Sequence, residues 1–68
     1  MRAGKVTILQ THPAVNRITV EYNGIEYSVN DRETYEKYQD KVGEYTNAVL
    51  EVRTYDDGTV KYDILSLE

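Results

Sequence analysis

Few side chains in this sequence could perform acid–base or nucleophilic chemistry. The only histidine, His12, stands beside the only proline, Pro13. There is no cysteine, and the only serines are Ser28 and Ser66. A catalytic histidine needs an orienting partner and a nucleophile within reach. The sequence does not supply such a set, so we interpret His12 as a loop residue and predict a protein that is not an enzyme.

Carboxylates are the second candidates for chemistry. Glu21 and Glu26 could form an acid–base pair or hold a divalent cation, but on an open sheet face both stay ionised, and no third ligand is evident. Asp56-Asp57-Gly58 lacks the alternating ligands and the distant glutamate of a calcium loop. We therefore predict a turn there, with no metal and no cofactor.

The aromatic residues point to contact more than to catalysis. All seven are tyrosines, and Tyr45 and Tyr55 are predicted to lie outward or in loops. Exposed tyrosine is a common anchor of protein interfaces. The predicted interaction surface therefore combines these tyrosines with acidic residues: Glu21, Glu26, Tyr45, Tyr55, Asp56 and Asp57.

Composition limits the classes of protein and partner. The 68 residues make one domain, 1–68, with a net charge of -4. Basic residues gather near the N-terminus (Arg2, Lys5, His12, Arg17), and the excess of acid lies in the last two thirds. No apolar run approaches a membrane span of about 20 residues. We expect a soluble, cytoplasmic protein with a basic protein partner in preference to a nucleic acid or a membrane.

The clearest structural signal is a hairpin that turns at Asn23-Gly24. Strand alternation covers residues 5–10 and 17–22, separated by a loop over 11–16. Asn-Gly is typical of a two-residue type I′ turn, which pairs Tyr22 with Ile25. This register puts Ile18, Val20 and Tyr22 on one face with Ile25, Tyr27 and Val29. On the other face it sets Glu21 directly opposite Glu26.

A helix is predicted after the third strand. Asn30 can cap it, Tyr35, Tyr38 and Val42 follow at helical spacing, and Gly43 can end it. Such a helix would cover one end of a sheet.

Two further strands are predicted at about residues 46–55 and 59–66. A three-residue loop at Asp56-Asp57-Gly58 pairs Leu50 with Ile64 and Val52 with Tyr62, which keeps the apolar residues together. The remaining apolar residues Val49, Leu65 and Leu67 then fall on the outer face. They could be covered by another strand, by the helix, or by a second copy of the chain in a homo-oligomer.

The predicted fold is mostly β within the α+β class: a small five-stranded antiparallel sheet or barrel in the order β-β-β-α-β-β. This order resembles that of the OB-fold, a five-stranded barrel with a helix between its third and fourth strands. The resemblance covers most of the chain and rests on topology alone. An SH3-like barrel and an open sheet with one helix stay as alternatives.

Three functions follow from these patterns. The first is a small non-catalytic interaction module of the adaptor, regulator or inhibitor type, with an acidic, tyrosine-bearing β surface. The second is an OB-type protein that binds single-stranded nucleic acid, which the basic N-terminal segment favours and the exposed acids disfavour. The third is a small self-assembling structural subunit.

Overall fold

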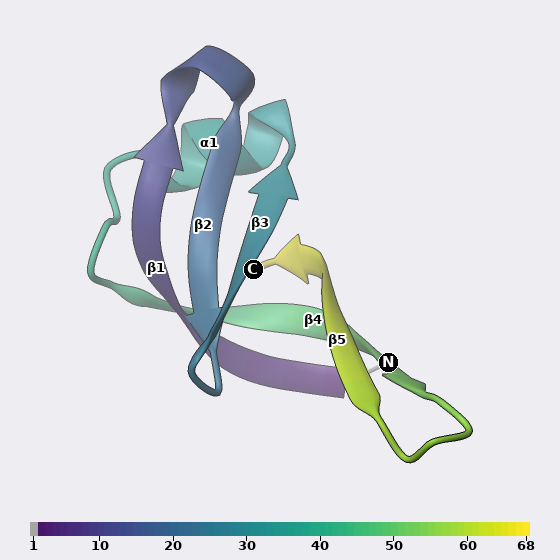
Figure 1. Ribbon diagram of the computed structural model, residues 1–68. Helices are drawn as coiled ribbons and strands as arrows, with labels where there is room; N and C mark the ends of the chain where they lie inside the picture. The colour runs from purple at the N-terminus through teal and green to yellow at the C-terminus, as the bar shows by residue number, and fades with distance from the viewer. Residues whose placement is uncertain (1) are drawn as a thin grey trace.

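The computed structural model describes residues 2–68, which form one antiparallel sheet, curled into a nearly closed barrel, and one α-helix (Figure 1). The elements in chain order are β1 (Arg2–His12), a 3-10 turn η1 (Pro13–Val15), β2 (Arg17–Tyr22), β3 (Ile25–Asn30), α1 (Arg32–Tyr38), β4 (Tyr45–Thr54) and β5 (Val60–Leu67). The five strands lie in the order β3-β2-β1-β4-β5. The predicted mostly-β fold class is confirmed.

The β2–β3 hairpin has the predicted register. Tyr22 pairs with Ile25, and Glu21 pairs with Glu26. Asn23 and Gly24 have φ angles of 52° and 79°, the left-handed values that a type I′ turn requires. Turn chemistry and apolar alternation therefore select the same pairing.

The β4–β5 hairpin also follows its predicted register near the turn. Leu50 pairs with Ile64 and Val52 with Tyr62. Gly58 has a φ of 85°, and its N–H donates to the carbonyl of Tyr55 at 2.9 Å. Figure 1 shows this hairpin projecting from the barrel, with its turn far from α1.

The far end of β5 differs from the prediction. The pairing shifts between Val49 and Leu50, because Val49 pairs with Ser66 while Leu50 pairs with Ile64. Leu65 is the extra residue, and this β-bulge turns every later side chain of β5 to the other face. The outward placement of Leu67 was therefore wrong: Leu67 pairs with Ala48 and is only 9% exposed, whereas Leu65 is 48% exposed.

Strand β1 joins the two halves of the sheet. Residues 2–7 pair with β4, and residues 7–12 pair with β2. A second bulge, at Leu9, interrupts the pairing with β2 between Ile8 and Gln10. Figure 1 shows β1 as a strongly curved strand, as the geometry of bulges leads one to expect. This curvature lets one strand contribute to both sides of the barrel.

The core lies inside the curl of the sheet. Its buried side chains come from β1, β2, β4, β5 and the helix: Val6, Ile8, Ile18, Val20, Tyr22, Tyr38, Ala48, Leu50 and Leu67. Tyr27, Val29, Tyr35, Tyr62 and Ile64 pack against them while partly exposed. The predicted inward faces of β2 and of the centre of β4 are thus confirmed.

The helix is shorter than predicted and begins one residue later. Asp31, not Asn30, caps it, because the Asp31 carboxylate accepts from the N–H of Thr34 at 3.0 Å and from its hydroxyl at 2.9 Å. The helix ends at Tyr38, so Val42 lies outside it and is exposed. Gly43, with a φ of 90°, does not end the helix but donates its N–H to the carbonyl of Ile8 at 2.7 Å.

Replacing the helix cap tests this assignment. Asp31→Ala is expected to lower the melting temperature, since Thr34 loses its acceptor. Hydrogen bonds from Thr34 lower the pKa of the Asp31 carboxyl. The ionised cap therefore stabilises the fold above the ordinary pKa of aspartate, and this contribution is lost as the pH falls through the lowered pKa. Thermal melts from about pH 7 to about pH 2 should show the two proteins converging in acid.

Asn30→Ala is the matched control for the cap. The Asn30 amide accepts from Nε of Arg17 at 3.3 Å and donates to the carbonyl of Val15 at 3.4 Å, both at exposed positions. Asn30→Ala should lower the melting temperature less than Asp31→Ala does, and its difference from the wild-type melting temperature should not shrink in acid. If Asn30→Ala gave the acid-dependent effect and Asp31→Ala did not, Asn30 would be the cap.

Candidate interaction surface

An acidic row crosses the outer face of the sheet. Glu26 pairs with Glu21, Glu21 with Thr7, and Thr7 with Tyr45, so these four residues occupy one register line across β3, β2, β1 and β4. Along their strands, Glu21 and Glu26 alternate with the core residues Val20, Tyr22 and Tyr27, and therefore face outward. Tyr45 is 70% exposed. The fold thus brings together three of the six predicted surface residues.

Glu21 and Glu26 have no ion-pair partner among the residues that the structure describes. Over residues 2–68, the ion pairs of the fold are Arg32–Glu36, Lys41–Asp40, Arg53–Glu51 and Arg53–Asp63, and none includes Glu21 or Glu26. Like charges directly opposite each other on neighbouring strands are destabilising. The acidic row therefore holds a repulsion that a cation from outside the chain would relieve.

A second pair of facing acids shows the alternative arrangement. Glu51 pairs with Asp63 across β4 and β5. Here Arg53 bridges the two carboxylates, with Nε 2.6 Å from Glu51 and an Nη 3.5 Å from Asp63. The hydrogen bond to Glu51, followed by the charges of Glu51 and Asp63, raises the pKa of Arg53. Among the described residues, the Glu51–Asp63 pair thus has a cation that contacts both carboxylates, whereas the Glu21–Glu26 pair has none.

The other three predicted residues lie elsewhere. Tyr55, Asp56 and Asp57 lie in the β4–β5 turn. This turn follows the last residue of β4, whereas Tyr45 is its first residue, and a strand of this length extends about 30 Å. The Asp57 carboxylate accepts from the N–H of Thr59 at 2.9 Å, and hydrogen bonds from Thr59 lower its pKa. Lys61 places its ammonium 5.8 Å from the ring centre of Tyr55. These residues shape the turn and do not join the acidic row.

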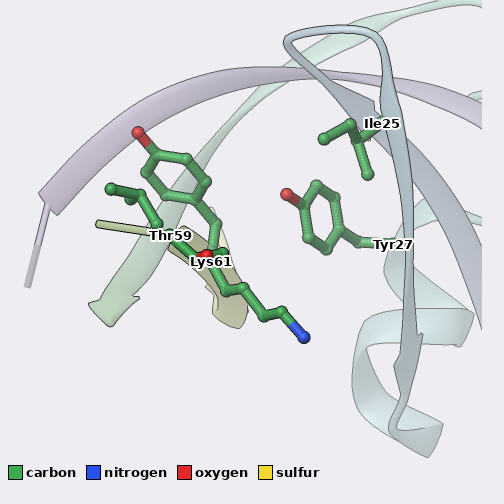
Figure 2. A pocket seen from close by; sticks show the side chains of 6 residues that line it. Ile25, Tyr27, Thr59 and Lys61 are labelled. Atoms are coloured by element: carbon green, nitrogen blue, oxygen red, sulfur yellow. The ribbon is translucent and has the colours of Figure 1, made fainter. Parts of the chain in front are cut away.

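A groove between β3 and β5 was not anticipated from the sequence. Its volume is about 370 Å³, and it is lined by Ile25 and Tyr27 from β3 and by Thr59, Val60, Lys61 and Tyr62 from the start of β5. Figure 2 shows Ile25 and Tyr27 on one side of the space and Thr59 and Lys61 on the other. Both strands are edges of the sheet, because β3 pairs only with β2 and β5 only with β4. The groove is where the barrel fails to close.

The lining of the groove is mostly apolar. Ile25 and Val60 are 56% and 46% exposed, although the register places both on the inner face of the sheet. Tyr22 and Tyr62 meet edge to face beside them, with ring centres 5.4 Å apart. Burial, and then the neighbouring Tyr62, Asp63 and Tyr22, raise the pKa of Tyr27. The only sequence signal for this groove was apolar side chains at strand ends, which strand closure could equally have buried.

The basic N-terminal residues are spread along β1 and β2. Arg2 and Lys5 pair with Leu50 and Asn47 of β4. His12 and Arg17 pair with each other at the far end, where Nε2 of His12 lies 3.2 Å from the hydroxyl of Thr19. His12 is thus the last residue of a strand and not a loop residue. The cations do not form one patch.

The remaining chemistry is sparse. Over residues 2–68 no group of three or more His, Cys, Asp or Glu side chains is placed to hold a metal ion. Within the same range no helix has the length and apolar character that crossing a membrane requires.

Comparison with known proteins does not assign a family. No family model, curated protein or solved structure matches this chain.

Proposed function

We propose that this chain is a small, non-catalytic interaction module that binds a basic surface of a partner protein through the outer face of β2 and β3. The observation that carries the proposal is the uncompensated Glu21–Glu26 pair in line with the exposed Tyr45. A lysine or arginine of the partner would remove the repulsion and gain two carboxylate contacts. An exposed tyrosine supplies apolar area and a hydroxyl at the same surface.

Single-stranded nucleic acid is the second candidate ligand. The strand order β3-β2-β1-β4-β5, with the helix between β3 and β4, supports an OB-like assignment, and His12 and Arg17 lie beside the face that OB-folds use. However, Glu21 and Glu26 occupy that face, where they would repel phosphates.

Self-assembly is the third candidate and has lost part of its basis. Leu67 is buried in the core, so only Val49 and Leu65 remain on the outer face.

We propose the cytoplasm as the compartment in which the protein acts, because the cysteine-free sequence needs no oxidising environment.

Neutralising one acid of each facing pair should change the stability of the fold in opposite directions. Glu21→Gln is expected to raise the free energy of unfolding by about 0.2–1 kcal/mol at low salt, because the repulsion is removed. Asp63→Asn should instead lower it, since Arg53 loses a partner. Urea denaturation measures both variants. Destabilisation by Glu21→Gln would mean that an internal cation compensates the pair.

Binding is tested by photo-cross-linking in a cell lysate. A photo-reactive amino acid replaces Tyr45 in the wild-type domain, in Glu21→Lys/Glu26→Lys, and in Glu33→Lys/Asp40→Lys, which changes the net charge equally at exposed sites outside the acidic row. We expect a discrete cross-linked protein with the first and third forms only. Equal cross-linking by all three forms would contradict the proposal.

A titration with single-stranded DNA separates the first two candidates. Affinity tighter than about 1 μM that falls steeply with salt would favour the nucleic-acid function over the protein partner.

A further inference from the structure

The directions of β3 and β5 determine what could fill the gap between them. Every neighbouring pair in the order β3-β2-β1-β4-β5 is antiparallel, so β1, β3 and β5 run one way and β2 and β4 the other. The two edges of the gap therefore run parallel to each other. Near the start of β5, where the two strands diverge (Figure 1), one added strand antiparallel to both would make all neighbours there antiparallel, the slightly more stable pairing.

Backbone groups of both edges face the gap. Tyr22 and Ile25 flank a two-residue turn and form a hydrogen-bonded pair, so the N–H and C=O groups of Glu26 and Ser28 point away from β2. On the other side, the N–H of Tyr55 donates to the carbonyl of Thr59 at 2.8 Å. The alternation then turns the N–H and C=O groups of Val60 and Tyr62 away from β4. Both edges therefore carry backbone donors and acceptors that no other strand of the sheet pairs.

The side chains at these positions match one inserted strand. On β3 the gap-facing backbone belongs to outward side chains, Glu26 and Ser28. On β5 it belongs to inward side chains, Val60 and Tyr62. A β-strand alternates in the same way, because successive residues turn both their side chains and their backbone groups to opposite sides. Its outward residues would pair with β3 and its inward residues with β5.

This register specifies the chemistry of the insert. Its inward side chains would lie in the apolar groove, on Ile25, Tyr27 and Tyr62. Its outward side chain opposite Glu26 would stand beside the uncompensated Glu21–Glu26 pair. Apolar residues suit the first positions, and lysine or arginine suits the second.

We infer that the gap between β3 and β5 binds an extended segment of a partner protein with alternating apolar and basic residues, running antiparallel to both strands. This inference rests on the proposed function and names the part of the partner that is bound. A second copy of the chain fits less well, since pairing of two β3 edges would bring two acidic rows together.

The test uses the full chain, labelled with nitrogen-15, and a capped peptide of about six residues in which lysine and valine alternate. We expect saturable binding below about 1 mM, with amide exchange slowed at Glu26, Ser28, Val60 and Tyr62. Val60→Lys should weaken binding by about tenfold or more, because an ammonium group would stand in the apolar groove. Val15→Lys, on the exposed η1 turn, adds the same charge elsewhere and should leave binding unchanged.

Two control peptides separate strand insertion from simple charge attraction. One has the same composition with its valines and lysines in two blocks, and the other is methylated at alternate backbone nitrogens. Both should bind more weakly than the alternating peptide. Equal binding of all three, or equal binding by the Val60→Lys protein, would overturn the inference. Slowed exchange at Glu26 and Ser28 that rises with protein concentration in the absence of peptide would assign the gap to a second copy instead.

The outcomes also separate this inference from the proposed function. If cross-linking at position 45 depends on Glu21 and Glu26 but the alternating peptide does not protect the gap, the basic-surface function stands and strand insertion fails. If neither result is obtained, both proposals fail.

Discussion

Gly4→Ala is expected to destabilise the fold by about 1–3 kcal/mol, although alanine ordinarily stabilises a strand relative to glycine. A Cβ atom at position 4 would lie 2.8 Å from Cδ1 of Leu50 and 2.8 Å from Cε1 of Tyr22. Both neighbours are buried, and Tyr22 also packs against Tyr62. The tyrosine ring therefore rests on the glycine backbone of β1 and cannot move without opening the core.

Heat or urea denaturation measures this effect. For a domain of this size, each kcal/mol should shift the melting temperature by about 4–8 °C. Ala3→Val is the matched control, because Ala3 is exposed on the other face of the same strand, and a change within about 0.5 kcal/mol is expected. Tyr22→Leu should reduce the cost of Gly4→Ala, since the two sites are in contact. A neutral or stabilising Gly4→Ala would show that Tyr22 does not cover Gly4.

Leu67→Ala is expected to lower the free energy of unfolding by about 2–5 kcal/mol, because it removes a buried side chain from the core. Leu67 lies opposite Ala48 inside the barrel, and the adjoining Glu68 donates its N–H to the carbonyl of Asn47 at 2.7 Å. The total stability of a domain is only about 5–15 kcal/mol. Losing this side chain should leave a measurable unfolded fraction at moderately raised temperature.

Leu65→Ala is the control for the bulge. It removes the same atoms from an exposed side chain two residues earlier and should cost less than about 1 kcal/mol. Denaturation curves of both variants test the facing of the strand directly. A larger loss for Leu65→Ala than for Leu67→Ala would mean that β5 alternates without a bulge.

Local signals were enough for the two hairpins. Asn23-Gly24 and Gly58 need left-handed backbone angles, and the length of each turn sets the pairing of the residues beside it. Because the apolar side chains also alternate with a period of two, only one register satisfies both constraints. The facing of Glu21 and Glu26 followed from the sequence for this reason.

Local signals were weaker at the helix. Asn30 and Asp31 are both good caps, and the sequence does not distinguish them. The choice depends on β3, which extends to Asn30 and uses its side chain to hold the η1 turn. The sequence predicted that Gly43 ends the helix, but its N–H donates instead to the carbonyl of Ile8, which lies far away in the chain.

The sequence by itself determined the strands, the two turns and the acidic pair, because each depends on residues within one hairpin. Only the tertiary structure decided that Leu67 faces the core, that the ring of Tyr22 packs on Gly4, and that a groove separates β3 from β5. Bulges such as those at Leu9 and Leu65 leave no residue-level signature, yet each reverses the facing of all later side chains. Whether two edge strands meet depends on the summed curvature of the sheet, to which every strand contributes. The site most open to a partner was thus the one that no single segment encodes.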